Sequence, residues 1–287
     1  MTADELRALL EPYGIRPIRD RGQHFLLDGR VVKAMVDAAG VGPGSRVVEI
    51  GPGPGILTEE LLGRGAEVTA IELDRKLAAL LRDRFGANPR FHLLEGDALN
   101  FSNAEIVSAF GAPSSELRAP SYKVVANLPY AITSNAIRKF LLEPPYPISV
   151  TVMIQREVAD RLLAKTGDMS GMAVLVRSIG EASSVVKVPA RSFYPPPRVD
   201  SSVIHIARKD PVILEAFFTG FGQDRFFAIV RAAFAGKRKQ LKNSLQGIGI
   251  DETGLFKAFS AAGIRPEARP ETLSVEDWRR LVLALTG

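Results

Sequence analysis

Short runs of apolar, β-branched residues alternate with helix-like stretches between Ser45 and about His205. The segments Leu57–Leu62 and Lys76–Phe85 carry apolar residues at helical spacing. Strands that alternate with helices predict a mostly parallel sheet covered on both faces, an α/β fold. The runs typical of buried strands are RVVEI (46–50), EVTAIE (67–72), RFHLLE (90–95), YKVVAN (122–127) and SVTVMIQ (149–155).

The pattern changes twice outside this central part. Two later β-like runs, SSVVKVP (183–189) and SSVIHIA (201–207), flank a proline-rich loop and predict antiparallel edge strands. After Asp210, helix-like segments dominate and are separated by turn signals at 247–249 and 265–270. We therefore expect two domains. Residues 1–208 form the α/β domain with a helical lead-in, and residues 209–287 form a small helical domain.

Composition narrows the class of protein. The 287 residues include no cysteine and only three histidines that lie far apart in sequence, so we expect no disulfide and no metal site. No apolar run reaches the length of a membrane span, and the N-terminus lacks the features of a signal peptide, so we expect a cytoplasmic protein without a membrane partner. We also expect a monomer. The net charge of +5 is weak support for a polyanionic partner.

The segment VVEIGPGPG (47–55) predicts a ligand-binding turn. A buried strand runs into Gly51, Gly53 and Gly55, and a helix begins at about Ile56. Glycines permit a sharp turn and close approach of a ligand to the backbone, and the helix N-terminus presents free N–H groups. The third glycine comes one position too early for the G-x-G-x-x-G pattern of dinucleotide enzymes, which disfavours NAD.

Two acidic residues follow at the ends of the next strands. Glu72 lies about 20 residues beyond the glycines, where a carboxylate can accept both ribose hydroxyls. Asp97, in LLEGDAL, ends the third strand and can accept a hydrogen bond from an adenine amino group, although taken alone this residue favours a helix N-cap. Strand ends of a parallel sheet share one edge, so we expect these groups beside one ligand.

The fourth strand ends in VVANLPY, with Asn127, Leu128, Pro129 and Tyr130. This segment resembles the (Asp/Asn)-Pro-Pro-(Tyr/Phe) motif of amino-methyltransferases, and with leucine second it resembles the ribosomal RNA adenine dimethyltransferase family. The resemblance implies a Rossmann-like methyltransferase sheet and S-adenosyl-L-methionine as cofactor. Asn127 and the Leu128 carbonyl would hold the adenine amino group, Pro129 would stiffen the turn, and Tyr130 would stack on the base.

Three more segments extend the resemblance. RGQHFL (21–26) is similar to the family's cofactor loop Phe-Gly-Gln-Asn-Phe-Leu, with His24 and Leu26 as contacts, but Arg21 and His24 depart from that pattern. In SFYPPPRVDSSV (192–203), Phe193 would cover the second face of a flipped adenine. AFAGKRKQLKNSL resembles the family's basic C-terminal helix, whose RNA contacts would be Lys237, Arg238, Lys239 and Lys242.

The favoured hypothesis is an enzyme that dimethylates N6 of two adjacent adenines in a hairpin loop near the 3′ end of small-subunit rRNA. Its partners would be that rRNA and the immature small ribosomal subunit. Three alternatives stay open: a large-subunit rRNA dimethylase that confers antibiotic resistance, an NAD-dependent dehydrogenase on a similar sheet, and a catalytically idle ribosome-assembly factor. The long C-terminal part disfavours the first, and the intact Asn-Leu-Pro-Tyr segment disfavours the other two.

Overall fold

The computed structural model describes residues 1–17, 23–111, 121–236 and 239–286. Within them the chain forms two compact units. The first contains residues 1–159 and 183–208, and the second contains residues 160–182 and 209–287. Among the described residues, no helix has the length and apolar character needed to cross a bilayer.

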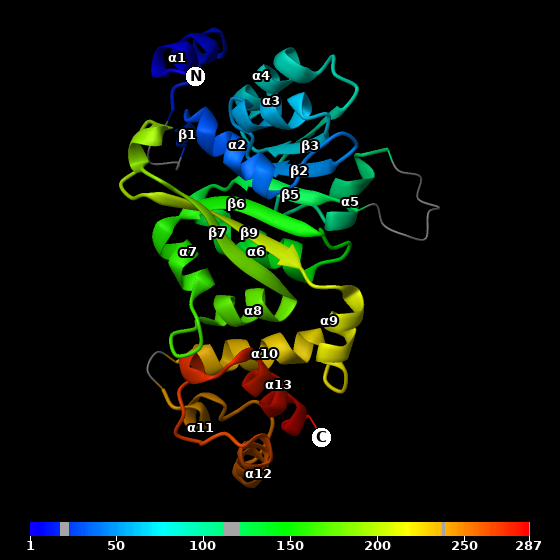
Figure 1. The fold of residues 1–287 in the computed structure, drawn as a ribbon, viewed down its shortest axis with the longest axis vertical. Helices are drawn as coiled ribbons and strands as arrows, with labels where there is room; N and C mark the ends of the chain where they lie inside the picture. The colour runs from blue at the N-terminus through cyan, green and yellow to red at the C-terminus, as the bar shows by residue number, and fades with distance from the viewer. Residues whose placement is uncertain (18–22, 112–120, 237–238, 287) are drawn as a thin grey trace. The chain divides into compact units, whose positions relative to one another are not determined.

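The first unit is built on one seven-stranded sheet (Figure 1). Neighbouring strands from β4 to β6 are parallel, and β9 runs antiparallel to β6 with Ile204 opposite Val152. The predicted α/β fold with a mostly parallel sheet and an antiparallel edge is thereby confirmed. The strands lie in the order β4 (Phe91–Glu95), β3 (Glu67–Glu72), β2 (Arg46–Ile50), β5 (Lys123–Asn127), β6 (Ser149–Gln155), β9 (Ser201–Arg208) and β7 (Gly180–Val188).

The strand order creates a switch point between β2 and β5. From β2 the chain adds β3 and then β4 on one side, and it returns to place β5 and β6 on the other side. The connections after β2 and β5 therefore leave the sheet in opposite directions, which opens a crevice at their carboxyl ends. The glycine turn follows β2 and the Asn-Leu-Pro-Tyr segment follows β5, so both face this crevice.

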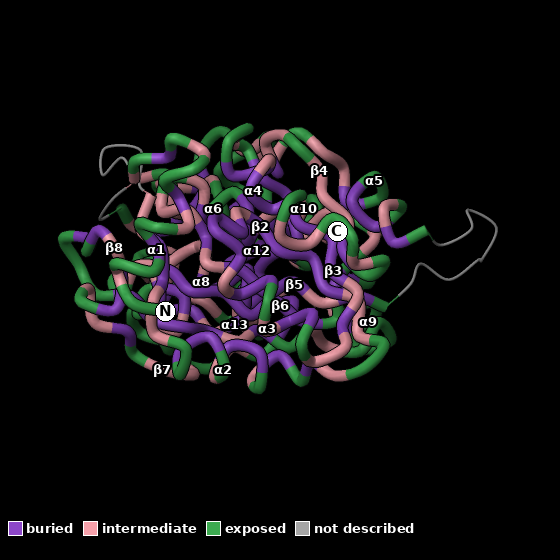
Figure 2. The backbone as a smooth tube through the Cα atoms, turned by 90° about the horizontal axis from the view of Figure 1, so that it is seen from above, coloured by how far each residue is buried: buried purple, intermediate pink, exposed green. Residues whose placement is uncertain are grey.

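Alternate side chains of the strands build the core. Val47, Val125 and Met153 belong to one apolar cluster with residues of α2 (Gly29–Ala38) and α3 (Ile56–Gly63). The central strands run through the buried interior (Figure 2). The remaining helices that begin in this unit are α4 (Arg75–Phe85), α5 (Asn103–Ser108), η3 (Tyr130–Ile132), α6 (Thr133–Leu142), α7 (Arg156–Leu163) and η4 (Ala190–Ser192).

The N-terminal segment packs against the same unit through apolar side chains and a short strand pair. Helix α1 (Ala3–Leu10), with a complete capping box at Thr2, is followed by η1 (Glu11–Tyr13) and packs in a small cluster with Phe25 of β1 (Phe25–Leu26). Strand β1 pairs antiparallel with β8 (Phe193–Tyr194). This ribbon joins the N-terminal loop to the proline-rich loop, which lies about 170 residues later in the chain.

The second unit is helical and contains one segment more than the expected residues 209–287. The segment 160–182 belongs to it, because the apolar helix α8 (Gly171–Ile179) packs against α10 and α13. Trp278, Phe226 and Phe259 are fully buried at its centre. Its other helices are α9 (Pro211–Phe218), α10 (Gln223–Phe234), α11 (Leu241–Ser244), α12 (Glu252–Ala262), η5 (Pro270–Thr272) and α13 (Val275–Ala284).

The basic stretch expected as part of one helix is interrupted. Helix α10 ends at Phe234, the chain bends at Ala235 and Gly236, and the four-residue α11 begins only at Leu241. Glycine disfavours helix because it has the most backbone freedom to lose, which explains a break at this point. Lys237 and Arg238 lie outside the described residues, while Lys239 is exposed and non-helical.

Candidate active site

The glycine turn after β2 requires glycine for steric reasons. Gly55 has φ +84° at the N-cap of α3, and a Cβ there would lie 2.4 Å from the ring of Phe85. Gly53 has φ +59°, and its Cβ would lie 3.1 Å from the ring of Phe25. Glycine at these two positions therefore allows Phe25 and Phe85 to pack against the turn, and Gly51 and Gly53 line the crevice.

Glu72 ends β3 and is bound to this turn. Its Oε2 accepts a hydrogen bond from the Gly53 N–H at 3.1 Å, and its Oε1 accepts one from the Asp74 N–H at 2.9 Å. The side chain is buried, and burial raises the pKa of its carboxyl group against the opposing effect of these N–H donors. Both carboxylate oxygens are thus oriented at the wall of the crevice.

Asn127 is the last residue of β5, and its amide is oriented by the N-terminal loop. Its Nδ2 donates to the backbone carbonyl of His24 at 3.4 Å, so Oδ1 is the end of the amide that stays available as an acceptor. The next residue, Leu128, is buried and its N–H donates to the Met153 carbonyl at 3.2 Å. These two bonds hold the strand end against β6 and against the loop.

Tyr130 stands beside Asn127 and is also fixed. Its hydroxyl shares a hydrogen bond of 2.8 Å with Oγ of Ser201, the first residue of β9. Burial raises the pKa of the Tyr130 phenol, so the ring is neutral at physiological pH. The ring of His24 lies 6.0 Å from it at an angle of 32°. Two rings from distant parts of the chain therefore line the same wall.

His24 connects the loop with the proline-rich segment. Its Nδ1 lies 2.7 Å from the Pro195 carbonyl, which can only accept, so Nδ1 carries the hydrogen. On β1, Leu26 pairs with Phe193 of β8, and both are buried. The structure thus brings together two elements that the sequence analysis treated separately, RGQHFL and SFYPPP. Arg21 lies outside the described residues.

Two adjoining pockets occupy the crevice. The larger, of about 100 Å³, and the smaller, of about 30 Å³, share Phe25, Gly51, Gly53 and Asn127. Among the sequence-predicted residues the larger pocket has His24, Glu72, Leu128, Pro129, Tyr130 and Phe193 in its wall, and the smaller has Leu26. The geometry therefore gathers nearly all the residues to which catalytic and cofactor-binding roles were assigned, and those roles remain predictions.

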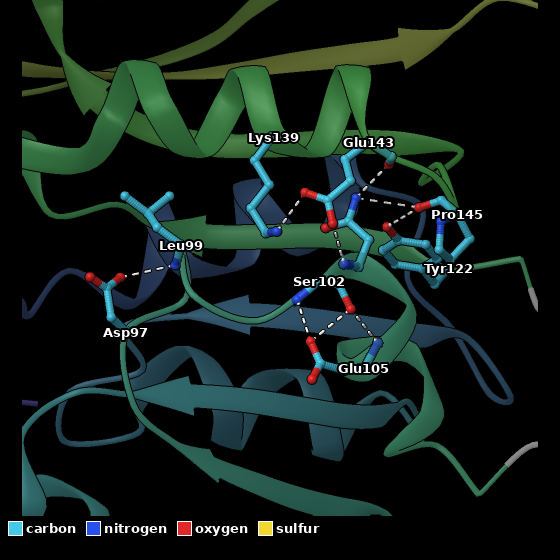
Figure 3. Close-up of polar contacts among 9 residues, drawn as sticks. Asp97, Leu99, Ser102, Glu105, Tyr122, Lys139, Glu143 and Pro145 are labelled. Atoms are coloured by element: carbon cyan, nitrogen blue, oxygen red, sulfur yellow. Dashed lines mark hydrogen bonds and ion pairs between the residues drawn. The ribbon is translucent and has the colours of Figure 1, made fainter.

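Asp97 is the exception. It does not line either pocket, and its Oδ1 accepts a hydrogen bond from the Leu99 N–H at 2.9 Å (Figure 3). This local turn precedes α5, which a capping box of Ser102 and Glu105 starts. The buried Asn103 then ties α5 to the end of α6, because its Nδ2 donates to the Glu143 carbonyl at 2.6 Å. Asp97 thus has a local turn contact in this structure, and its role as an adenine acceptor stays a prediction.

The sequence analysis missed Glu49. This residue of β2 is 1% exposed and lines the smaller pocket, where its Oε2 accepts a hydrogen bond from the Thr58 hydroxyl at 2.7 Å. Burial, opposed by that hydrogen bond and aided by the charge of Glu72, raises the pKa of Glu49 to about 8. The available signal was a glutamate inside the otherwise apolar run RVVEI, since an acid is rarely buried without a reason.

The site offers polar and apolar ligand contacts and has no metal-binding constellation. Among the described residues, no three His, Asp or Glu side chains cluster in a way that could hold a metal ion. The pocket instead combines a glycine cradle, two buried carboxyl groups, an oriented amide and aromatic rings. These groups suit an organic cofactor next to a planar base.

Comparison with known proteins agrees with this chemistry. Residues 18–286 match the family model described as Ribosomal RNA adenine dimethylase. The chain is 40% identical over 283 residues to Ribosomal RNA small subunit methyltransferase A of Dehalococcoides mccartyi, which covers 98% of this chain and 93% of that protein. It is also 40% identical over 274 residues to the protein of the same name from Moorella thermoacetica, a match that covers 94% of this chain and 93% of that protein.

Two solved structures share the fold over most of the chain. The crystal structure of the 23S rRNA methyltransferase ErmE has a TM-score of 0.66 at 27% identity and covers 91% of this chain and 99% of that one. A dimethyladenosine transferase from Plasmodium falciparum has a TM-score of 0.72 at 24% identity, with 90% and 96% covered. The second likeness bears on the fold alone.

Proposed function

Because this chain belongs to the ribosomal RNA adenine dimethylase family, we propose that it dimethylates N6 of two adjacent adenines near the 3′ end of small-subunit rRNA. The methyl donor is S-adenosyl-L-methionine, and the substrate is an immature small ribosomal subunit bound by a monomeric, cytoplasmic enzyme. The observation that carries the proposal is the placement of Asn127 and Tyr130 in one pocket with the glycine turn.

The residues of the pocket fit a methyl donor of this kind. A Cβ at Gly53 or Gly55 would meet Phe25 or Phe85, so the turn carries no side chains at these positions, which suits the close approach of a ligand to its backbone. Glu72 would accept the ribose hydroxyls, and a positive charge on the ligand would favour the ionised form of the buried carboxyl groups beside it. His24, Leu26, Gly51, Gly53, Asp97 and Asn127 complete the proposed cofactor contacts.

The chain itself mainly supplies position and electrostatics. When bound, the methyl donor supplies a methyl group on a sulfonium, a strong electrophile whose sulfur leaves as a neutral thioether. The adenine N6 is a poor nucleophile because its lone pair is delocalised into the ring. Oδ1 of Asn127 and the carbonyl of Leu128 would accept the two N6 hydrogens, which would favour a more pyramidal nitrogen with a more available lone pair. The N6 proton then passes to water.

Aromatic side chains hold the base in the pocket. An enzyme that acts on a base takes it out of its stack, and stacking on protein rings offsets part of that cost. Tyr130 offers one ring, fixed by its bond to Ser201, and Phe193 offers the other from the β1–β8 ribbon. Pro129, with φ −56°, stiffens the turn between Asn127 and Tyr130.

The direct test is transfer of labelled methyl groups to immature small subunits, followed by mapping of the modified adenines. We expect two neighbouring N6-dimethyladenines in the small-subunit rRNA. Label in large-subunit rRNA would favour the antibiotic-resistance type of enzyme, and subunit binding without label would favour an idle assembly factor. Titration with NAD separates the dehydrogenase alternative, since tight NAD binding without binding of a methyl-donor analogue would overturn the proposal.

The basic segment of the second unit is proposed to follow RNA phosphates. Neutralising Lys237, Arg238 and Lys239 together is expected to weaken rRNA binding and to reduce the slope of log affinity against log salt by about 2, because each phosphate contact releases counterions. Neutralising Lys242 should change the salt slope less, since the Lys242 ammonium already pairs with the Glu267 carboxylate at 3.1 Å. Filter binding at several salt concentrations measures both, with the exposed Lys33 on α2 as the control. An unchanged slope for the triple variant would make the segment only a solvated surface.

A further inference from the structure

A second cavity lies in the helical unit, between α11 and α12. Lys242, Asn243 and Gln246 contribute to one wall, and Glu252 and Phe256 to the other. Its volume of about 230 Å³ far exceeds the roughly 10–15 Å³ that one water needs. A neighbouring hollow shares Phe256 and Glu252. This hollow region contains none of the residues of the proposed methyl-transfer site.

Phe256 is an aromatic side chain that the core does not use. Helix α12 buries Leu255, Ala258, Phe259 and Ala262 along one stripe, and Phe259 is 1% exposed. Phe256 lies off that stripe and is 42% exposed. An exposed ring in the wall of a cavity provides a flat apolar surface on which another ring can stack.

The polar groups around Phe256 suit the edge of a nucleobase. The exposed amides of Asn243, on α11, and Gln246, in the turn after it, both line the cavity, and each carries donors and acceptors. Glu252 adds a further acceptor, which suits an exocyclic amino group and disfavours a simple anion. Unpaired RNA is recognised by this combination of stacking and base-edge hydrogen bonds.

Charge connects the cavity with the basic segment. Lys242 belongs both to the cavity wall and to the stretch that carries Lys237, Arg238 and Lys239. Its side chain stays one-third exposed beside Glu267. On α12, the exposed Lys257 lines the neighbouring hollow. A strand whose phosphates follow Lys242 and Lys257 would pass over the cavity, with a base within reach of Phe256.

We propose that the cavity between α11 and α12 binds one unpaired nucleotide of the RNA substrate, with its base stacked on Phe256 and its edge toward Asn243 and Gln246. This inference depends on the proposed function in one respect, namely that the substrate is RNA. It lies in a different unit from the methyl-transfer pocket, so it acts in substrate binding and not in chemistry.

The test compares Phe256→Ala with Phe256→Trp, which keeps a stacking surface. The matched control is Val212→Ala on α9, since Val212 is 73% exposed in the same unit. The probes are two RNAs with the same target hairpin, one with single-stranded flanks and one without. We expect Phe256→Ala to lose roughly tenfold in affinity for the flanked RNA only, with affinity retained in Phe256→Trp and in the control. Cofactor affinity should be unchanged in all variants.

Two results would overturn the site, namely an unchanged affinity of Phe256→Ala for the flanked RNA or an equal loss on both RNAs. The proposed function is judged separately by methyl transfer from the wild-type enzyme. A wild-type protein that binds the flanked RNA but transfers no methyl group would contradict the proposed function. The affinity comparison would still test whether the cavity binds RNA.

Discussion

Methyl transfer by an Asn127→Ala variant is expected to fall by at least about 100- to 1000-fold, the usual effect of removing one oriented polar group from a reacting centre. The amide of Asn127 is held by the carbonyl of His24, and its oxygen is the acceptor left for the N6 hydrogens. Alanine removes that acceptor and sacrifices only one long hydrogen bond. Cofactor affinity should therefore stay close to that of the wild type. Single-turnover transfer and calorimetric titration measure the two quantities.

Two further variants sharpen this experiment. Asn127→Asp keeps an oxygen acceptor at the same position, so it should retain more transfer than alanine does. Asn100→Ala removes an exposed asparagine of the same unit and should leave the rate unchanged. A full-rate Asn127→Ala enzyme would exclude the amide from the mechanism. A variant that loses cofactor binding as strongly as transfer would mean that Asn127 acts mainly through its proposed cofactor contact and not through the N6 hydrogens.

The sheet could be predicted because local sequence determines most of it. The runs at 46–50, 67–72 and 149–155 match the observed strands β2, β3 and β6 residue for residue. Parallel strands buried on both faces are almost continuously apolar, which is a strong signal. The position of the cofactor turn and of Asn127 at strand ends followed from the same pattern, since the carboxyl ends of parallel strands share one edge.

Contacts between distant segments could not be predicted in this way. Strand β1 pairs with β8 across about 170 residues, and each strand has only two residues, too few to show any periodicity. The orientation of Asn127 by His24 and of Tyr130 by Ser201 depends on this kind of contact. The resemblance of RGQHFL and SFYPPP to family elements singled out these two segments but gave no reason for them to touch.

The second unit shows another limit of pattern reading. The stretch around 231–246 has apolar and basic residues at helical spacing, yet the described chain leaves the helix at Phe234. One glycine and the packing of α11 outweigh that periodicity, because propensity is a weak guide once tertiary contacts form. Segment 160–182 joins this unit for a similar reason, since the apolar face of α8 finds its partners there.

Replacing Glu49 by glutamine is expected to remove a large pH dependence from the stability of the first unit. The pKa of Glu49 is raised from 4.5 to about 8, chiefly by burial. Between these values the unfolded chain releases the proton while the folded chain keeps it, so the free energy of unfolding falls as pH rises. The slope reaches about 1.4 kcal/mol per pH unit, and below pH 4.5 the penalty vanishes. Glutamine cannot ionise and still accepts from Thr58.

Urea denaturation from pH 5 to pH 8, followed by circular dichroism, compares the wild type with this variant. The difference in unfolding free energy should grow in favour of Glu49→Gln as pH rises. Thr58→Val should extend the decline of the unfolding free energy to higher pH at the same limiting slope, because the Thr58 hydroxyl lowers the pKa of Glu49. Glu11→Gln, at an exposed position, is the matched control and should run parallel to the wild type. Parallel curves for Glu49→Gln as well would mean that Glu49 is ionised in the folded protein, and the electrostatic account of the cofactor pocket would have to start from two negative charges.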